Sequence, residues 1–135
     1  MQGKITKNIS NLYTVESNNK TYICHLRGKF RYEKLTPLVG DYVEFSEEEL
    51  IINNILPRKN SLDRPMIANV DSALIITSVK KPDLSLLLLD KEITLVLSNN
   101  IEPIIVLTKI DLLNSDEFKK IKYLIQYYYH HHVIY

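Results

Sequence analysis

One stretch indicates the fold of the second half of the chain: Ile101-Glu102-Pro103-Ile104-Ile105-Val106-Leu107-Thr108-Lys109-Ile110-Asp111-Leu112-Leu113. Residues 104–107 form a continuous apolar run, mostly β-branched, which is typical of a strand that is covered on both faces. The polar turn 108–111 follows at once, and ligand-binding residues of α/β sheets cluster just past the carboxyl ends of such strands. The stretch therefore predicts a buried parallel strand that runs into a candidate binding turn.

The turn 108–111 has the pattern [N/T]KxD, which is the guanine-recognition element of GTPases. The carboxylate of Asp111 could accept both N–H groups on the Watson–Crick edge of guanine, a pair that adenine lacks. The stem of Lys109 could lie over the base plane. The alternative is an Asx-type turn in which Asp111 caps the next segment. The four residues alone leave both interpretations open.

Glycine occurs only at Gly3, Gly28 and Gly40. Phosphate-binding loops need glycines, because their backbone N–H groups must approach the phosphates closely. Residues 41–135 therefore contain no P-loop, and the chain as given is not expected to hold a triphosphate in the usual way.

Composition indicates an ordinary globular protein. The chain has 135 residues, 45% of them hydrophobic and 24% charged, with a formal net charge of +1. That length allows one domain or two small ones, and that charge indicates no global attraction to a polyanion. The single cysteine, Cys24, excludes an internal disulfide and argues against a zinc site. No signal-peptide pattern or long apolar run is present, so we expect a cytoplasmic protein that does not span a membrane.

Residues 1–57 have the pattern of a small barrel. Short alternating strands separated by turn residues are predicted at 4–7, 12–16, 21–26, 40–45 and 50–56. Five strands of this length match an oligonucleotide/oligosaccharide-binding (OB) barrel. An SH3-like barrel is the nearest competitor, and periodicity cannot separate the two.

A basic and aromatic segment, residues 20–34, lies within this barrel. Its side chains alternate charge with rings, as contacts to single-stranded or structured RNA require. The alternative is that the charges solvate an exposed loop while the rings pack inward. The segment contains Lys20, Tyr22, His25, Arg27, Lys29, Phe30, Arg31, Tyr32 and Lys34 against one acid, Glu33.

The pattern changes after a proline-flanked basic segment at 58–70, which predicts an ordered linker. Beyond it, strands are predicted at 72–79 and 104–107, and helices at 84–97 and about 116–128. Strand–helix–strand–helix at this spacing predicts βαβ units with a parallel sheet. The last residues, 133–135, resemble the opening of a third strand.

Four stretches, in a fixed order, carry a resemblance that covers nearly the whole chain. They are Leu26-Arg27-Gly28-Lys29-Phe30-Arg31; Leu38-Val39-Gly40-Asp41-Tyr42-Val43, with the pattern VGD.V; the junction 57–71, with the pattern PR.N.L.RP..ANVD; and Leu107-Thr108-Lys109-Ile110-Asp111-Leu112. Together they resemble the RsgA/YjeQ family of circularly permuted GTPases, which depend on the small ribosomal subunit. The junction and the G4 motif behind a barrel form a far more specific signal than TKxD alone.

The resemblance implies an all-β OB-type barrel at 1–57, a linker at 58–70 and, at 71–135, the first part of an α/β, parallel-sheet GTPase domain. The family's motif order is permuted, so its G5 motif, P-loop and magnesium-binding motifs, and its zinc-binding domain, would follow residue 135. This order would explain why no glycine follows Gly40. Magnesium and zinc are implied only for that downstream part, and this chain is expected to be inactive alone.

The resemblance also implies that the intact protein hydrolyses GTP to GDP and phosphate and acts in late maturation of the small (30S) ribosomal subunit. A cytoplasmic monomer is expected. Thr108, Lys109 and Asp111 would bind guanine, although Thr108 replaces the commoner asparagine and loses the amide that ties this motif to the P-loop region. The barrel would contact ribosomal RNA, and the candidate residues are Arg27, Lys29, Phe30, Arg31 and Arg58.

A stand-alone RNA- or ribosome-binding OB module without nucleotide hydrolysis is the alternative function. In that case residues 71–135 would serve only as an interaction surface, and the chain would melt cooperatively. The GTPase-fragment interpretation predicts instead exposed apolar sheet edges and helix faces in residues 71–135. A metal-dependent enzyme has little support, because the acidic residues fall on separate predicted elements without ligand spacing.

Overall fold

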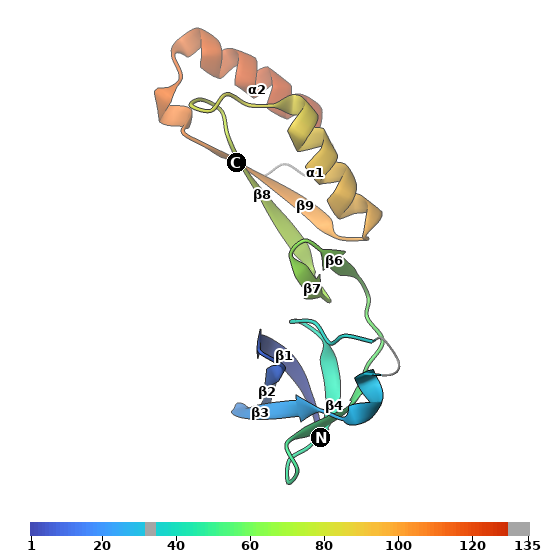
Figure 1. The fold of residues 1–135 in the computed structure, drawn as a ribbon. Helices are drawn as coiled ribbons and strands as arrows, with labels where there is room; N and C mark the ends of the chain where they lie inside the picture. Colours follow the sequence, from blue (N-terminus) through green and yellow to red (C-terminus); the bar gives the residue numbers. More distant parts are fainter. Residues whose placement is uncertain (32–34, 130–135) are drawn as a thin grey trace. The chain divides into compact units, whose positions relative to one another are not determined.

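The computed structural model describes the backbone of residues 1–31 and 35–129, and the side chains of all of these except Arg31 and Tyr129. The chain divides into two compact units, Met1–Val70 and Asp71–Tyr135. Figure 1 shows the elements of both units in sequence colours. The strand expected at 133–135 lies outside the described residues.

The first unit is built on a closed five-stranded barrel with the order β1-β2-β3-β5-β4. The barrel closes where Gly3 of β1 pairs with Val43 of β4, and β3 pairs with β5 in parallel, His25 with Ile51. This connectivity confirms the expected OB-type barrel. Its strands are β1 (Gln2–Ile9), β2 (Leu12–Ser17), β3 (Lys20–Leu26), β4 (Tyr42–Ser46) and β5 (Ile51–Ile55), with a short 3-10 turn, η1 (Gly28–Arg31), after β3.

Alternation along the strands produces the barrel core. Every second residue points inward, so the apolar members of each strand meet inside the barrel. Phe30 joins them from η1, outside the strands. Burial raises the pKa of the Cys24 thiol in this core. The buried side chains are Ile5, Tyr13, Val15, Cys24, Phe30, Val43, Phe45 and Ile52.

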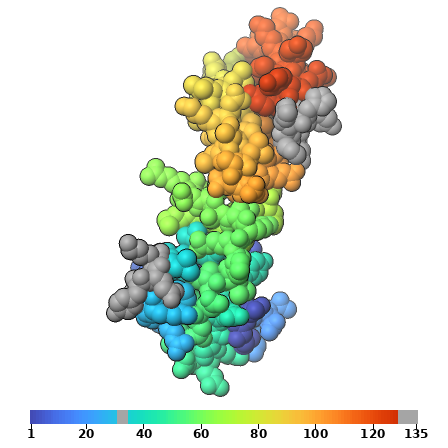
Figure 2. Space-filling view, turned by 90° about the vertical axis from the view of Figure 1, so that its right-hand side faces the viewer, coloured from blue at the N-terminus to red at the C-terminus, as the bar shows by residue number. Residues whose placement is uncertain are grey.

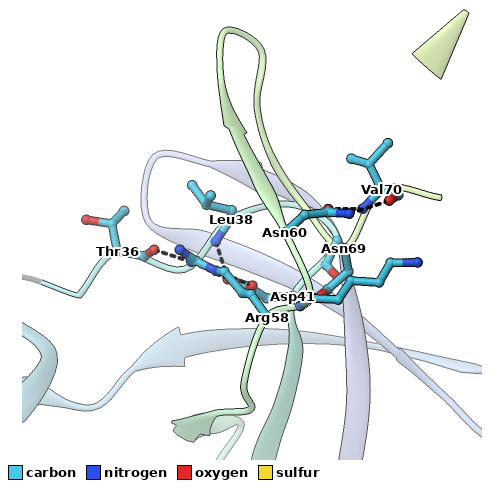
Figure 3. A network of polar contacts seen from close by, with 9 residues as sticks. Thr36, Leu38, Asp41, Arg58, Asn60, Asn69 and Val70 are labelled. Carbon is cyan, nitrogen blue, oxygen red and sulfur yellow. Dashed lines mark hydrogen bonds and ion pairs between the residues drawn. The ribbon is translucent and has the colours of Figure 1, made fainter. Parts of the chain in front are cut away.

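Residues 58–70, where the sequence predicts a linker, contain a hairpin and fall within the first unit. The hairpin consists of β6 (Ser61–Asp63) and β7 (Met66–Ala68). Figure 3 shows the polar contacts at its base. The guanidinium of Arg58 donates to the buried carboxylate of Asp41 and, at 2.9 Å, to the carbonyl of Thr36.

Backbone contacts join the same hairpin to the segment before β4. The amide of Ala68 donates to the carbonyl of Val39 at 2.9 Å, and the side chain of Asn69 donates to the carbonyl of Gly40 at 3.0 Å. Asn60 accepts from the amide of Val70 and donates to its carbonyl, both at 2.7 Å. These hydrogen bonds satisfy backbone groups that lie outside the strand ladders. They also hold residues 58–70 against the barrel.

The second unit is a partial parallel α/β fold, as expected. Its strands β8 (Ser72–Ser78) and β9 (Glu102–Thr108) run parallel, with Ser78 opposite Thr108. Helix α1 (Leu86–Ser98) is capped by Ser85, whose hydroxyl accepts from the amide of Leu88. After β9 come the 3-10 turn η2 (Ile110–Leu112) and helix α2 (Ser115–Tyr129).

Helices α1 and α2 lie side by side (Figures 1 and 2). Together with β9 they line an apolar core. Ile105 of β9 is buried there, and Ile125 of α2 lines the same core. Tyr128 of α2 donates to the carboxylate of Asp90 of α1 at 2.7 Å. The pKa of Tyr128 is raised to about 12, mainly by burial and next by this hydrogen bond.

The opposite face of the strand pair is exposed on β8, as judged from the residues that the structure describes. Alternate residues of β8 differ sharply, because Ile75 is 7% exposed while Leu74 and Ile76 are 62% and 66% exposed. Parallel strands in globular proteins are usually covered on both faces. The GTPase-fragment interpretation predicts exposed sheet edges and helix faces; the second unit exposes this sheet face, and on α1 it exposes Leu87 and Leu88.

Candidate guanine site and barrel surface

The candidate guanine site lies at the carboxyl ends of β8 and β9. Both strands end at this edge, and the amide of Val79 continues the ladder by donating to the carbonyl of Thr108 at 3.2 Å. The hydroxyl of Thr108 donates back to the carbonyl of Thr77 at 3.3 Å. Lys109 then adopts a left-handed conformation, with φ 62° and ψ 29°, and turns the chain into η2. Thr108 and Lys109 are thus positioned by the end of the sheet.

The side chains of Lys109 and Asp111 have different surroundings. The ammonium of Lys109 donates to the carbonyl of Lys81, in the loop after β8. Asp111 lies in η2 and is exposed, and within residues 1–31 and 35–129 no hydrogen bond to its carboxylate is found. An exposed carboxylate at the carboxyl edge of a sheet can accept hydrogen bonds from a ligand.

The cap of α2 is Asn114, which argues against the alternative that Asp111 has this role. The side chain of Asn114 accepts from the amide of Glu117 at 2.9 Å, and the carboxylate of Glu117 accepts from the amide of Asn114 at 3.0 Å. This reciprocal pair is a capping box. Sequence reasoning missed it, although the spacing Asn-x-x-Glu is its signature.

Lys80 is a second residue of the site that sequence reasoning missed. Its ammonium lies 2.9 Å from each carboxylate oxygen of Glu117, so it links the loop after β8 to the start of α2. The pKa of the Glu117 carboxyl is lowered, mainly by the hydrogen bond from Lys80 and next by the backbone hydrogen bond from Asn114. No local pattern indicates this pair, because its members are 37 residues apart.

The five candidate RNA contacts have different surroundings in the structure. Arg27 and Lys29 are exposed, with the guanidinium of Arg27 donating to the side chain of Asn53 at 3.1 Å. Phe30 is 4% exposed and belongs to the barrel core, so its ring fits packing rather than base stacking. Arg58 is bonded to Asp41, and the side chain of Arg31 lies outside the described part of the chain.

In the part of the chain that the structure describes, no group of three or more His, Cys, Asp or Glu side chains is arranged to hold a metal ion. None of the helices in that part is both long and apolar enough to cross a membrane.

Comparison with known proteins assigns the family. The model of the RsgA N-terminal domain matches residues 2–50, and the model of the RsgA GTPase matches residues 55–134. The chain belongs to the RsgA family. The first match ends within the barrel, and the second includes the hairpin, both strands of the second unit and the candidate guanine site.

Relatives named small ribosomal subunit biogenesis GTPase RsgA are similar over most of this chain. The RsgA 2 protein of Oceanobacillus iheyensis is 48% identical over 130 residues, which are 94% of this chain and 44% of that protein. The protein of Geobacillus sp. is 50% identical over 117 residues, 84% of this chain and 40% of its own length. The chain thus spans less than half the length of these RsgA relatives.

Solved structures agree with the RsgA assignment. YjeQ from Thermotoga maritima matches 98% of this chain and 50% of its own, with a TM-score of 0.88 and 35% identity. YloQ, described as a circularly permuted GTPase, also matches 98% of this chain and 50% of its own, with a TM-score of 0.79 and 38% identity. The fold and the family are therefore assigned on sequence and structure together.

Proposed function

We propose that this chain supplies the RNA-binding barrel and the guanine-recognition half of a GTPase that acts in late maturation of the small ribosomal subunit. Its proposed partners are ribosomal RNA and a guanine nucleotide, and its proposed setting is a monomer in the cytoplasm. Support comes from the family assignment and from one local observation. The carboxylate of Asp111 is exposed at the carboxyl edge of the strand pair, beside the anchored Lys109.

The chemistry of guanine recognition would be divided between two side chains. The carboxylate of Asp111 would accept the two N–H groups of guanine's Watson–Crick edge, and adenine would be rejected because it lacks that pair of donors. The ammonium of Lys109 is held by the carbonyl of Lys81, which leaves its four-carbon stem to lie against the base. Hydrolysis is not proposed for these 135 residues alone, because no glycine follows Gly40 to form a phosphate loop.

Millimolar GMP and AMP, titrated into the isotope-labelled chain, test the guanine site. We expect GMP to shift the NMR amide signals of residues 109–112, while AMP leaves them in place. Asp111→Asn should reverse the preference from GMP to XMP, because a carboxamide can donate to the extra carbonyl of xanthine. Equal responses to GMP and AMP, or shifts that map to the barrel, would contradict the proposal. Asp116→Asn is the matched control, since Asp116 is an exposed acid in the first turn of α2.

RNA binding by the barrel is tested by the salt dependence of binding to purified small ribosomal subunits. Removing one phosphate contact should flatten the slope of log affinity against log salt by about one unit. We expect Lys29→Gln and Arg27→Gln to have this effect and Lys91→Gln, on α1, to have none. Unchanged slopes for both barrel variants would remove these residues from the proposed interface.

A further inference from the structure

Two lysine side chains connect the loop after β8 with the segment that follows β9. Lys109, in the candidate guanine turn, donates to the carbonyl of Lys81. Lys80, the neighbour of Lys81, donates in the opposite direction to both carboxylate oxygens of Glu117, each at 2.9 Å. Adjacent residues of one loop therefore hold both ends of the segment 109–117.

Between these two anchors, the segment has few bonds of its own. Its turn η2 is closed by Leu112, whose amide donates to the carbonyl of Lys109 at 3.1 Å, and by Leu113, whose amide donates to the carbonyl of Ile110 at 3.2 Å. The hydrogen bonds of a 3-10 turn have poorer geometry than those of an α-helix, so two such bonds hold this turn weakly. The orientation of Asp111, in the middle of this turn, therefore depends on the groups that hold its ends.

Glu117 takes part in two contacts at the C-terminal anchor. One of its carboxylate oxygens accepts from the backbone amide of Asn114 at 3.0 Å, so the ion pair with Lys80 also fixes the residue that caps α2. The Lys80 and Glu117 side chains are 31% and 38% exposed. Ion pairs with this exposure contribute little to global stability, so their effect is local.

We propose that Lys80 and Glu117 are positioning residues for guanine recognition, because they hold the turn that carries Asp111 in the orientation that the base requires. This inference rests on the proposed guanine site. Neither residue touches the base; each acts through the shape of segment 109–117.

Amide exchange measured by NMR on the full 135-residue chain tests the positioning role without a nucleotide. Lys80→Gln and Glu117→Gln each remove the ion pair, and the glutamine at 117 keeps the capping box. In both variants, exchange at Leu112 and Leu113 should accelerate roughly two- to five-fold, as expected for a partly exposed ion pair. Exchange at Ile105 and Val106 in β9 should stay unchanged.

Further variants separate positioning from general stability. In the double variant, exchange at Leu112 and Leu113 should be no faster than in either single variant, because each single substitution already removes the same ion pair. Lys80→Arg should restore slow exchange, and Lys119→Gln, which removes a charge elsewhere on α2, should change nothing. Unchanged exchange at Leu112 and Leu113 in Lys80→Gln, or equal acceleration at Ile105, would overturn the proposal.

GMP affinity, followed through the same amide signals, separates this inference from the function on which it rests. We expect Lys80→Gln to weaken GMP binding by a factor similar to its exchange effect, with Lys80→Arg restoring it. A loosened turn with unchanged GMP affinity would overturn the positioning role. Failure of the unmodified chain to prefer GMP over AMP would overturn the proposed guanine site, while the exchange data would still decide whether the ion pair holds the turn.

Discussion

The buried carboxylate of Asp41 accepts two hydrogen bonds from the guanidinium of Arg58, one at each oxygen and both 2.7 Å long (Figure 3). The amide of Leu38 donates a third, also at 2.7 Å. A carboxylate that is removed from water needs this set of donors, because an isolated buried charge is strongly unfavourable. Asp41's hydrogen bond also raises the pKa of Arg58. The pair thus joins the start of β4 to the hairpin segment and gives Arg58 a structural role.

Asp41→Asn should destabilise the first unit by about 3 kcal/mol, because removing one partner of a buried pair leaves the other uncompensated. Arg58 is partly exposed and can regain water, so the lower end of the usual range applies. Urea unfolding followed through amide signals of the barrel strands measures this loss. Asp63→Asn, at an exposed acid of β6, is the control and should leave the midpoint unchanged. An unchanged midpoint for Asp41→Asn would show that the pair contributes nothing.

Gly40 and Gly28 offer a matched pair of substitutions. Gly40 has φ +95°, and a Cβ there would lie 2.0 Å from the carbonyl oxygen of Ala68, whereas a Cβ at Gly28 meets nothing within 4 Å. Gly40→Ala should therefore lower the free energy of unfolding by at least about 2 kcal/mol, because the left-handed backbone and the clash both destabilise the folded state. Gly28→Ala should change the melting temperature little. Equal effects in thermal melts would contradict the described contact with β7.

Phe30 tests whether the ring beside the basic residues packs or stacks. Phe30→Ala should destabilise the barrel by about 3–4 kcal/mol, because a buried ring leaves a cavity. Lys29→Gln, one residue away and exposed, should leave stability unchanged. A Phe30→Ala variant of full stability that binds the ribosomal subunit more weakly would restore the stacking interpretation.

Local sequence patterns were sufficient for the barrel strands and for the strands and helices of the second unit, but not for the hairpin of β6 and β7. Alternation through Tyr13 and Val15 predicts β2, because burial on one face imposes a period of two. The unbroken apolar run 104–107 predicts β9 as a strand covered on both faces, and in this structure it is buried on one face only. The fixed spacing of Lys109 and Asp111 after that strand predicts the candidate site. These features depend on neighbours in the chain, and they need no knowledge of the fold.

Partners distant in sequence could not be predicted in the same way. Arg58 has the composition of an RNA contact, and only the fold brings it to Asp41, 17 residues away. Phe30 follows no strand period, so its place in the core depends on the path of η1. Lys80 and Glu117 also meet only after β8, β9 and α2 are assembled.

The pH dependence of Glu117 provides a further test of its ion pair. The hydrogen bond from Lys80 makes the largest contribution to lowering the pKa of Glu117, and the hydrogen bond from the backbone amide of Asn114 makes the next largest. The charges of Lys80 and Lys120 lower this pKa slightly more, while burial raises it. Because the folded-state pKa lies below the unfolded value of about 4.3, the small, local stabilisation by the pair is fully present above that pH. Its contribution is lost as the pH falls through the folded-state pKa. A carboxyl-carbon NMR titration should show this lowered midpoint, and Lys80→Gln should raise it toward the ordinary value.

The uncovered face of β8 should promote association of the chain. Leu74 and Ile76 expose large apolar side chains next to each other on this face, and exposed apolar patches of this kind favour self-association and dye binding. Leu74→Thr with Ile76→Thr should reduce ANS fluorescence and the associated fraction in sedimentation velocity, because threonine keeps the strand preference while removing apolar surface. Ile75→Thr, on the buried face, should instead lower the melting temperature, since it places a hydroxyl in the core. If the double variant associates as strongly as the unmodified chain, this face is not the surface that drives association.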